Sequence, residues 1–299
     1  MPSPTERDAL PALDGVGASR IVLPAGPWTR VLSFLQQRFA DIDPEVWQTR
    51  MARGRVLDEC GMALAPDAPY RPGASLYYYR EVGPEPEIPF AAEILFHDEH
   101  LLVVDKPHFL QVMPAGRYVQ QTLLVRLQKQ LPELPLTALH RLDRGTAGIV
   151  LFSVNPATRA SYHALFRTRS MHKTYAALAP SLPTENFPQT RRTRIVEGEP
   201  FFRMRETDGA PNTETRIEVA EHRGALSLYR LQPITGKKHQ LRVHLAALGA
   251  PIVNDPLYPE VWPEGPDDFT RPLKLLAQEL AFEDPLTGQP RSFISRFLL

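Results

Sequence analysis

An acid flanked by two arginines stands before an apolar run near the middle of this chain. The stretch HRLDRGTAG at residues 140–148 places Asp143 between Arg141 and Arg144, and IVLFSV follows. A carboxylate beside arginines tends to stay ionised with a depressed pKa, which suits a nucleophile or a charge stabiliser better than a general acid. The alternative is a charged turn before a strand, with solvated arginines and with glycines that supply the bend.

Two further segments carry residues that could act together with Asp143. In KTYAALAP, Tyr175 follows Lys173. Its phenol could serve as a base or a donor, although a tyrosine on a strand is usually half-buried packing. In PITGKKHQLRVHLAALGAP, His239 and Arg242 are three residues apart, so on a helix both can point to one spot. An arginine there could hold a carboxylate through two parallel hydrogen bonds.

The metal-binding residue types do not form a recognisable zinc pattern. His239 and His244 are five residues apart, which misaligns them on a helix, and no nearby acid completes a site. The single cysteine, Cys60, excludes an internal disulfide framework and a Cys-based metal cluster within one chain. We therefore expect Cys60 to pack in the core and the protein to hold no metal. The turn Asp105-Lys106-Pro107 is expected to do no more than end a strand.

Short strands and a few helices must position these residues. The segment EILFHDEHLLVVDKP predicts two strands around an acidic turn, and GIVLFSV and KTYAALAP predict further strands. Asn155 as N-cap with Pro156 at the first helical position predicts a helix over NPATRASYHALFRTRS. A second helix is expected to be capped by Thr235 and closed by Gly249. Strand-like stretches outnumber the helices that crossovers need, so we expect an α+β domain with a mixed, mostly antiparallel sheet.

The first third of the chain has a different organisation. Residues 1–13 are polar and are expected to be a disordered tail. Residues 14–82 should form a small α/β unit of two helices and short strands, in which Asp43 and Pro44 mark a helix start. Residues 83–89 are a proline-rich linker, and the main domain occupies residues 90–299.

The overall charge is balanced, with 34 basic and 34 acidic residues, but its distribution is not. Residues 141–173 carry six basic residues and one acid, and residues 226–253 carry four basic residues and no acid. These segments are candidates for a phosphate-facing surface, although a charge run is more often a solvated face. No apolar stretch approaches the roughly 20 residues of a membrane helix, and the chain starts without a basic and then apolar segment. We expect a cytoplasmic protein.

The ordered set of motifs resembles the RluA-type pseudouridine synthases. It comprises VVDKP, HRLDRGTAGIVLFS, KTYAALAP and PITGKKHQLRVHLAALGAPIVNDPLY, and the similarity covers about residues 90–293. Residues 14–80 resemble a diverged alpha-L RNA-binding module, the type named after ribosomal protein S-four. The resemblance implies an isomerase that converts uridine to pseudouridine in RNA, without any cofactor.

The resemblance also implies roles for single residues. Asp143 matches the essential catalytic acid, and Arg242 matches the arginine that pairs with it. Tyr175 matches the tyrosine that lies against the uracil and can mediate proton transfer. Arg141 matches the arginine that enters the RNA in place of an extruded base. His140 is expected to be structural or RNA-facing. The other expected RNA contacts are Arg144, Lys173, Lys237, Lys238 and His239 in the main domain, and Arg50, Arg53 and Arg55 in the N-terminal unit.

The chain departs from the family pattern at a few positions. His108 and Phe109 follow Lys-Pro where a small residue and glycine are usual, and Met113 replaces a common histidine. Asn254 stands in place of glycine and Leu276 in place of histidine. These departures bear on the substrate and not on the reaction.

Several alternatives stay open from the sequence. The carboxylate can attack the ribose or stabilise positive charge as the glycosidic bond breaks. Ribosomal RNA of the large subunit is the preferred substrate and tRNA the next. A catalytically silent RNA-binding or ribosome-assembly protein is the main alternative, and a glycosidase-like hydrolase with a carboxylate pair is another. Nothing requires more than a monomer.

Overall fold

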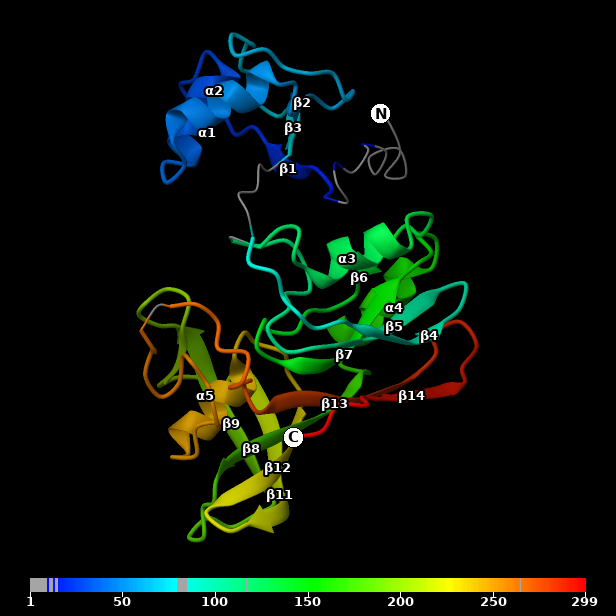
Figure 1. Ribbon diagram of the computed structural model, residues 1–299, viewed down its shortest axis with the longest axis vertical. Coiled ribbons are helices and arrows are strands. Elements are labelled where there is room, and N and C mark those ends of the chain that lie inside the picture. Colours follow the sequence, from blue (N-terminus) through cyan, green and yellow to red (C-terminus); the bar gives the residue numbers. More distant parts are fainter. Residues whose placement is uncertain (1–9, 11–12, 14–15, 80–84, 117, 264) are drawn as a thin grey trace. The chain divides into compact units, whose positions relative to one another are not determined.

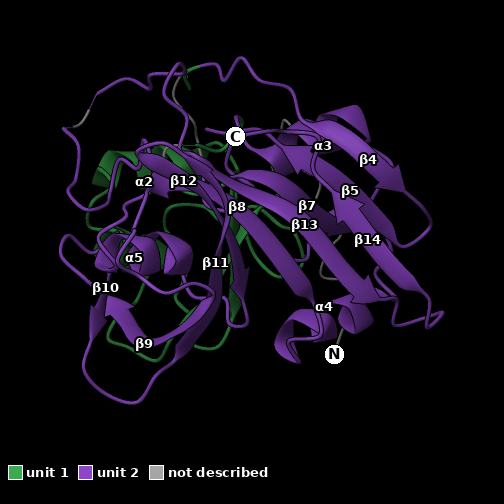
Figure 2. Ribbon diagram, turned by 90° about the horizontal axis from the view of Figure 1, so that it is seen from below, with its two compact units in different colours: residues 1–86, 114–120 green, residues 87–113, 121–299 purple. Residues whose placement is uncertain are grey.

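The chain forms two compact units. The computed structural model describes residues 10, 13, 16–79, 85–116, 118–263 and 265–299. Unit 1 comprises residues 1–86 and 114–120, and unit 2 comprises residues 87–113 and 121–299 (Figure 1, Figure 2). The tail expected at residues 1–13 lies almost entirely outside the described residues, as does the start of the linker expected at 83–89. No helix among the described residues is long and apolar enough to cross a membrane.

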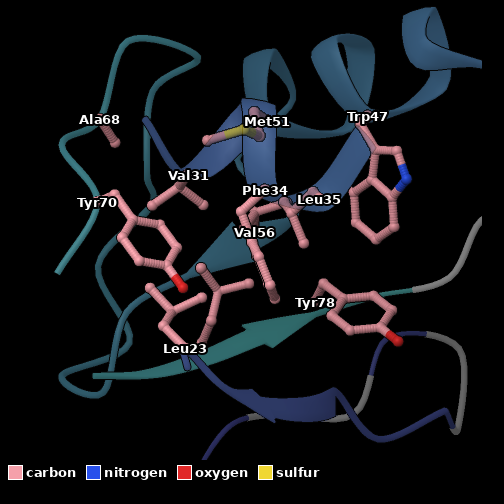
Figure 3. Close-up of a cluster of buried hydrophobic side chains, with 11 residues drawn as sticks. Leu23, Val31, Phe34, Leu35, Trp47, Met51, Val56, Ala68, Tyr70 and Tyr78 are labelled. Atoms are coloured by element: carbon pink, nitrogen blue, oxygen red, sulfur yellow. The ribbon is translucent and has the colours of Figure 1, made fainter. Parts of the chain in front are cut away.

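Unit 1 packs two helices on a small antiparallel sheet. The strands lie in the order β1-β3-β2, and the helices α1 and α2 come between β1 and β2 in the chain. Their bounds are β1 Ser19–Val22, α1 Val31–Arg38, α2 Pro44–Ala52, β2 Val56–Leu57 and β3 Ser75–Tyr78. Asp43 accepts a hydrogen bond of 2.9 Å from the Glu45 amide, and Pro44 is the first helical residue, which confirms the predicted helix start. Figure 3 shows the core between helices and sheet, in which Phe34, Leu35 and Trp47 are buried.

Cys60 does not pack in the core, contrary to expectation. It is exposed, in the turn that follows β2. The Asp58 carboxylate accepts hydrogen bonds from the amides of Cys60 and Met62, both 2.9 Å long. The turn therefore closes around Asp58 and leaves the thiol at the surface.

Unit 2 is built on one sheet of eleven strands in the order β10-β9-β11-β12-β8-β13-β7-β5-β4, with β14 on β13 and β6 on β7. The strands are β4 Glu93–His97, β5 Leu101–Lys106, β6 Thr137–Ala138, β7 Ala147–Ser153, β8 His172–Pro180, β9 Gln189–Glu197, β10 Met204–Thr207, β11 Thr213–Arg223, β12 Leu226–Pro233, β13 Leu275–Glu283 and β14 Pro290–Ile294. Among the described residues, every pairing between these strands is antiparallel except that of β13 with β7. The predicted α+β class with a mostly antiparallel sheet is confirmed.

Two strands near the centre of this sheet, β5 and β7, are rich in apolar residues, which explains their burial. All residues of β5 and β7 are buried, as is expected of strands covered on both faces. Gly148 is the exception to ordinary strand backbone, with φ of +114°, and a Cβ there would lie 2.2 Å from the Ala277 carbonyl oxygen. Only glycine fits where β13 joins β7, because that contact is too close for any side chain.

The helices of unit 2 are α3 Leu123–Gln130, α4 Arg159–Arg167 and α5 Gln240–Ala247. Two predicted helix starts are wrong by a few residues. Asn155 caps a turn, where its side chain accepts from the Ala157 amide, and α4 begins only at Arg159. Thr235 does not cap α5, because its hydroxyl donates to the Gln240 side chain at 2.8 Å, and the residue before α5 is His239.

Candidate active site

The loop between β6 and β7 presents Asp143 to the N-terminal half of α5. The Asp143 side chain is 30% exposed, and its Oδ2 accepts a hydrogen bond of 3.2 Å from Arg242 Nη1. His239 Nε2 lies 3.8 Å from the same oxygen. Burial raises the pKa of Asp143, but the charges of Arg242 and of nearby basic groups outweigh it and hold the pKa below its ordinary value. Asp143 is therefore an ionised carboxylate that faces partly to solvent.

A second acid fixes the arginine that contacts Asp143. Arg242 is 4% exposed, and its Nε and Nη2 donate to the two oxygens of Asp255 at 2.8 and 2.6 Å. Asp255 Oδ1 also accepts from the backbone amides of Leu257 and Tyr258. Asp255 thus holds one edge of the guanidinium and leaves Nη1 directed at Asp143. The sequence reasoning missed Asp255, and the available signal was a lone acid in the motif PIVNDPLY.

The Tyr258 ring lies against the Arg242 guanidinium, and His239 contacts Tyr258. The guanidinium carbon lies 5.3 Å from the centre of the Tyr258 ring. His239 has a left-handed backbone, with φ of 56°, and its Nδ1 is 3.0 Å from the Tyr258 hydroxyl. Burial lowers the pKa of His239 to about 4. At neutral pH His239 is therefore an uncharged residue within the site, where it can contact a ligand as a hydrogen-bonding group and not as a cation.

Tyr175 lies half-buried on β8, beside the carboxylate. Burial and the negative charge of Asp143 both raise the pKa of its phenol above the ordinary value. A neutral phenol is a hydrogen-bond donor and acceptor and is a poor base by itself. The structure thus brings Asp143, Tyr175 and Arg242 together from three separate segments, and the raised pKa keeps the Tyr175 phenol protonated, so that it can donate a hydrogen bond.

Lys106 lies beneath the loop that carries Asp143, although the sequence indicated only a turn. The side chain is fully buried, and Nζ donates to the carbonyls of Pro107 at 3.0 Å, Leu110 at 2.7 Å and Arg144 at 3.3 Å. Burial lowers the pKa of Lys106 to about 7, against the opposing charge of Asp143. The lysine ties the end of β5 to the loop that carries Asp143.

Replacing Lys106 by methionine should lower the rate constant of the isomerisation that the resemblance implies by about tenfold or more, because the freed carbonyls let the loop shift and small displacements at a site are costly. Burst kinetics on RNA would measure this rate constant separately from RNA affinity. Exposed Lys129→Met serves as the control for the loss of one positive charge. An unchanged rate constant in Lys106→Met would contradict the positioning role.

The same loop is held by contacts that this chain makes in place of the usual small residue and glycine. His108 Nδ1 is 2.6 Å from the Gly145 carbonyl oxygen. Phe109 has a left-handed backbone, with φ of 65°, and packs edge-on against Phe269 at 5.1 Å. Arg144 donates hydrogen bonds to both carboxylate oxygens of Asp267. Its guanidinium therefore pairs with an acid of the same unit and is not a solvated surface cation.

The other predicted RNA contacts occupy different environments. His140 is structural, since its Nε2 accepts from the Leu151 amide at 3.1 Å and burial lowers its pKa to about 3. Lys173 is half-buried, and burial lowers its pKa. Arg50 is 4% exposed and lies over the Trp47 ring, so it is placed as a core residue of unit 1. The remaining candidates lie at least partly at the surface: Arg141, Lys237, Lys238, Arg53 and Arg55.

Three histidines predict how stability depends on pH. Burial lowers the pKa of His140 to about 3 and the pKa values of His239 and His244 to about 4, against about 6.5 in the unfolded chain. The unfolded state binds more protons below pH 6.5, so this stability is complete above pH 6.5 and is lost as the pH falls towards 4.

We expect the free energy of unfolding to drop by at least about 3 kcal/mol between pH 7 and pH 4.5 in urea titrations. His244 makes hydrogen bonds of about 3 Å to the hydroxyls of Thr193 and Thr215. The variant His244→Gln should therefore show a shallower pH dependence than the wild type. Equal slopes would show that His244 is not one of the titrating groups.

The sequence of this chain matches a protein family and is similar to characterised and uncharacterised relatives. Residues 100–247 match the family described as RNA pseudouridylate synthase, a range that includes Asp143, Tyr175 and Arg242. An uncharacterised RNA pseudouridine synthase of Synechocystis is 30% identical over 231 residues, with 76% of this chain and 79% of that protein covered. The dual-specificity RNA pseudouridine synthase RluA of Vibrio vulnificus is 34% identical over 67% of this chain and 81% of its own length.

The solved structures agree with the sequence relatives. The human protein named RNA pseudouridylate synthase domain containing 1 is 27% identical and superposes with a TM-score of 0.57, over 71% of this chain and 86% of that one. The human protein with domain containing 4 in its name is also 27% identical, with a TM-score of 0.55 over 69% and 88%.

Proposed function

This chain belongs to the RluA-type family of RNA pseudouridine synthases, and from that premise we propose that Asp143 is the carboxylate with which it isomerises specific uridines in structured RNA. The observation that carries the proposal is the ionised Asp143, held by a buried Arg242 that Asp255 fixes from behind. Such an arrangement keeps a negative charge in place at a partly enclosed site without waiting for solvent to reorganise.

The reaction needs a fixed negative charge. The bond between N1 of uracil and C1′ of ribose breaks, the base turns over, and C5 bonds to C1′ with loss of the C5 proton. A carboxylate can attack the sugar or stabilise the positive charge that develops as the first bond breaks. Tyr175, with its neutral phenol beside Asp143, is the proposed partner that lies against the uracil and passes the proton.

The RNA must deliver the uridine out of its stack. Arg141 is exposed and stands two residues before Asp143, and it makes no hydrogen bond or ion pair with any residue the structure describes. We propose that it enters the RNA in place of the extruded base and lowers the cost of holding the nucleotide open. Lys237 and Lys238, exposed before α5, are the proposed phosphate contacts.

Ribosomal RNA of the large subunit is the proposed substrate, with tRNA next. The relatives' names include a dual-specificity RNA pseudouridine synthase and a yeast mitochondrial tRNA pseudouridine(32) synthase. We further propose that the chain works as a monomer with no metal or organic cofactor, and that residues 14–82 contribute an RNA-binding module of the alpha-L type.

A tritium-release assay tests the function. Ribosomal RNA and tRNA labelled with [5-³H]uridine, transcribed without modifications, should release tritium when the full chain is added, with equal yield in the presence of EDTA. Mapping of pseudouridines in RNA from a deletion strain would then identify the position. RNA binding without release from any RNA would support the alternative of a catalytically silent binding protein.

A glycosidase-like hydrolase would need a second carboxylate near Asp143. Asp255 lies near it, but both of its oxygens already accept hydrogen bonds. Both oxygens of Asp255 are occupied by Arg242, and Oδ1 also accepts two backbone amides. A carboxylate used in this way cannot activate a water molecule, so Asp255 is placed to orient Arg242.

A further inference from the structure

The hairpin of β9 and β10 carries a phenylalanine that faces solvent. Phe201 is 81% exposed at the tip, and its ring meets the edge of the Phe202 ring at 5.6 Å. The turn is closed by hydrogen bonds between Gly198 and Arg203 at 3.0 Å and between Arg203 and Pro200 at 2.8 Å. The turn thus holds a large aromatic side chain in contact with solvent. Such exposure of a phenylalanine is unusual and can mark a binding site.

The hairpin is anchored to the proposed active site through Tyr258. The Tyr258 hydroxyl accepts from the Met204 amide at 2.8 Å, donates to its carbonyl at 3.1 Å, and lies 3.0 Å from His239 Nδ1. Arg203 donates to the Pro259 carbonyl at 2.6 Å. Phe201 is three residues before Met204, so their Cα atoms are at most about 11 Å apart. Figure 2 shows β9 and β10 beside α5, the helix that carries Arg242.

The two faces of the hairpin differ in charge. The inner face packs Ile195 and Met204 against Val243 and Tyr258. The acid of β10, Glu206, accepts two hydrogen bonds from Arg191 at 2.8 and 2.6 Å.

The outer face of the hairpin is basic. Val196 pairs with Arg205, and Arg194 pairs with Thr207, so these residues alternate with the inner set. Arg194 and Arg205 are exposed, and neither makes an ion pair with another described residue.

We propose that Phe201 is a stacking platform for an unpaired base of the substrate RNA, close to the extruded uridine, and that Arg194 and Arg205 contact the neighbouring phosphates. The proposal rests on the proposed function, because it takes the bound RNA as the occupant. Exposed aromatic rings next to arginines bind single-stranded bases by stacking and their backbone by charge.

Binding of a fluorescein-labelled 12-nucleotide oligouridylate to the full chain tests the platform. Phe201→Ala should weaken binding by about tenfold, and Phe201→Trp should restore it, because tryptophan keeps the stacking surface. The same oligomer with abasic sites should bind all of these proteins equally weakly. Ile294→Ala, which removes another exposed apolar side chain on β14, is the matched control and should bind as the wild type does.

Three outcomes would overturn the platform. They are unchanged binding by Phe201→Ala, an equal loss in Phe201→Trp, and a loss that is the same for the abasic oligomer. A shift of oligomeric state in Phe201→Ala without a change in RNA affinity would instead assign the ring to a protein contact. The assay measures binding and not product, so failure of the isomerase function would appear as absent tritium release and would leave this result unaffected.

Discussion

Replacing Asp143 by asparagine should reduce the rate of pseudouridine formation by more than about 10³-fold, with little change in RNA affinity or stability. Asparagine has the shape of aspartate and can still accept the hydrogen bond from Arg242 Nη1, which is 3.2 Å long in the wild type. What is lost is the negative charge, and with it both the nucleophile and the electrostatic stabiliser. The effect should therefore appear in the chemical step.

Tritium release under single-turnover conditions measures this loss, and filter binding of the same RNA measures affinity. Asp268→Asn is the matched control, because it removes the same charge from an exposed acid that serves a turn with Thr270. Its activity should equal that of the wild type. Activity of Asp143→Asn within tenfold of the wild type would show that the Asp143 carboxylate is not the catalytic group.

Replacing Asp255 by alanine should lower the free energy of unfolding by about 3–5 kcal/mol and abolish activity. The Asp255 side chain is fully buried, and its removal leaves the Arg242 charge in the interior without its bidentate partner. The amides of Leu257 and Tyr258 lose their acceptor as well. Arg242 would then be free to rotate, and the hydrogen bond that orients Asp143 would be lost.

A double variant separates the stability effect from the catalytic one. Asp255→Ala combined with Arg242→Met removes both charges, so it should be more stable than Asp255→Ala alone while it stays inactive. Urea unfolding with the wild type and the single Arg242→Met variant completes the cycle. A loss of less than about 1 kcal/mol in Asp255→Ala would show that Arg242 does not depend on this carboxylate.

The sequence predicted the strands because they have local signatures, whereas the roles of Asp143, Tyr175 and Arg242 were implied by the resemblance of the motifs to a family. Runs such as VVDKP and GIVLFSV mark buried strands, and β5 and β7 are the observed result. The three-residue spacing of His239 and Arg242 predicted that both side chains point to one spot, and both do approach Asp143 Oδ2.

The rest of the site depends on contacts that no local pattern reveals. Lys106 looked like a turn residue because a fully buried lysine is rare, and its three carbonyl partners come together only in the fold. Asp255 comes 13 residues after Arg242, beyond the reach of a helical spacing rule. Arg50 was expected to face RNA, but its guanidinium lies over the Trp47 ring, and side-chain direction within a short helix is set by packing.

The join of β7 to β13 has a consequence for synthesis of the protein. The two strands pair where Ala147 meets Leu276, so β7 remains without this neighbour until β13 has been translated. A parallel pairing of such long sequence separation forms slowly and late. Nascent chains that end before β13 should therefore leave Ala147 and Gly148 at the start of β7 without their strand partner, whereas unit 1 has its own core and can fold earlier on the ribosome.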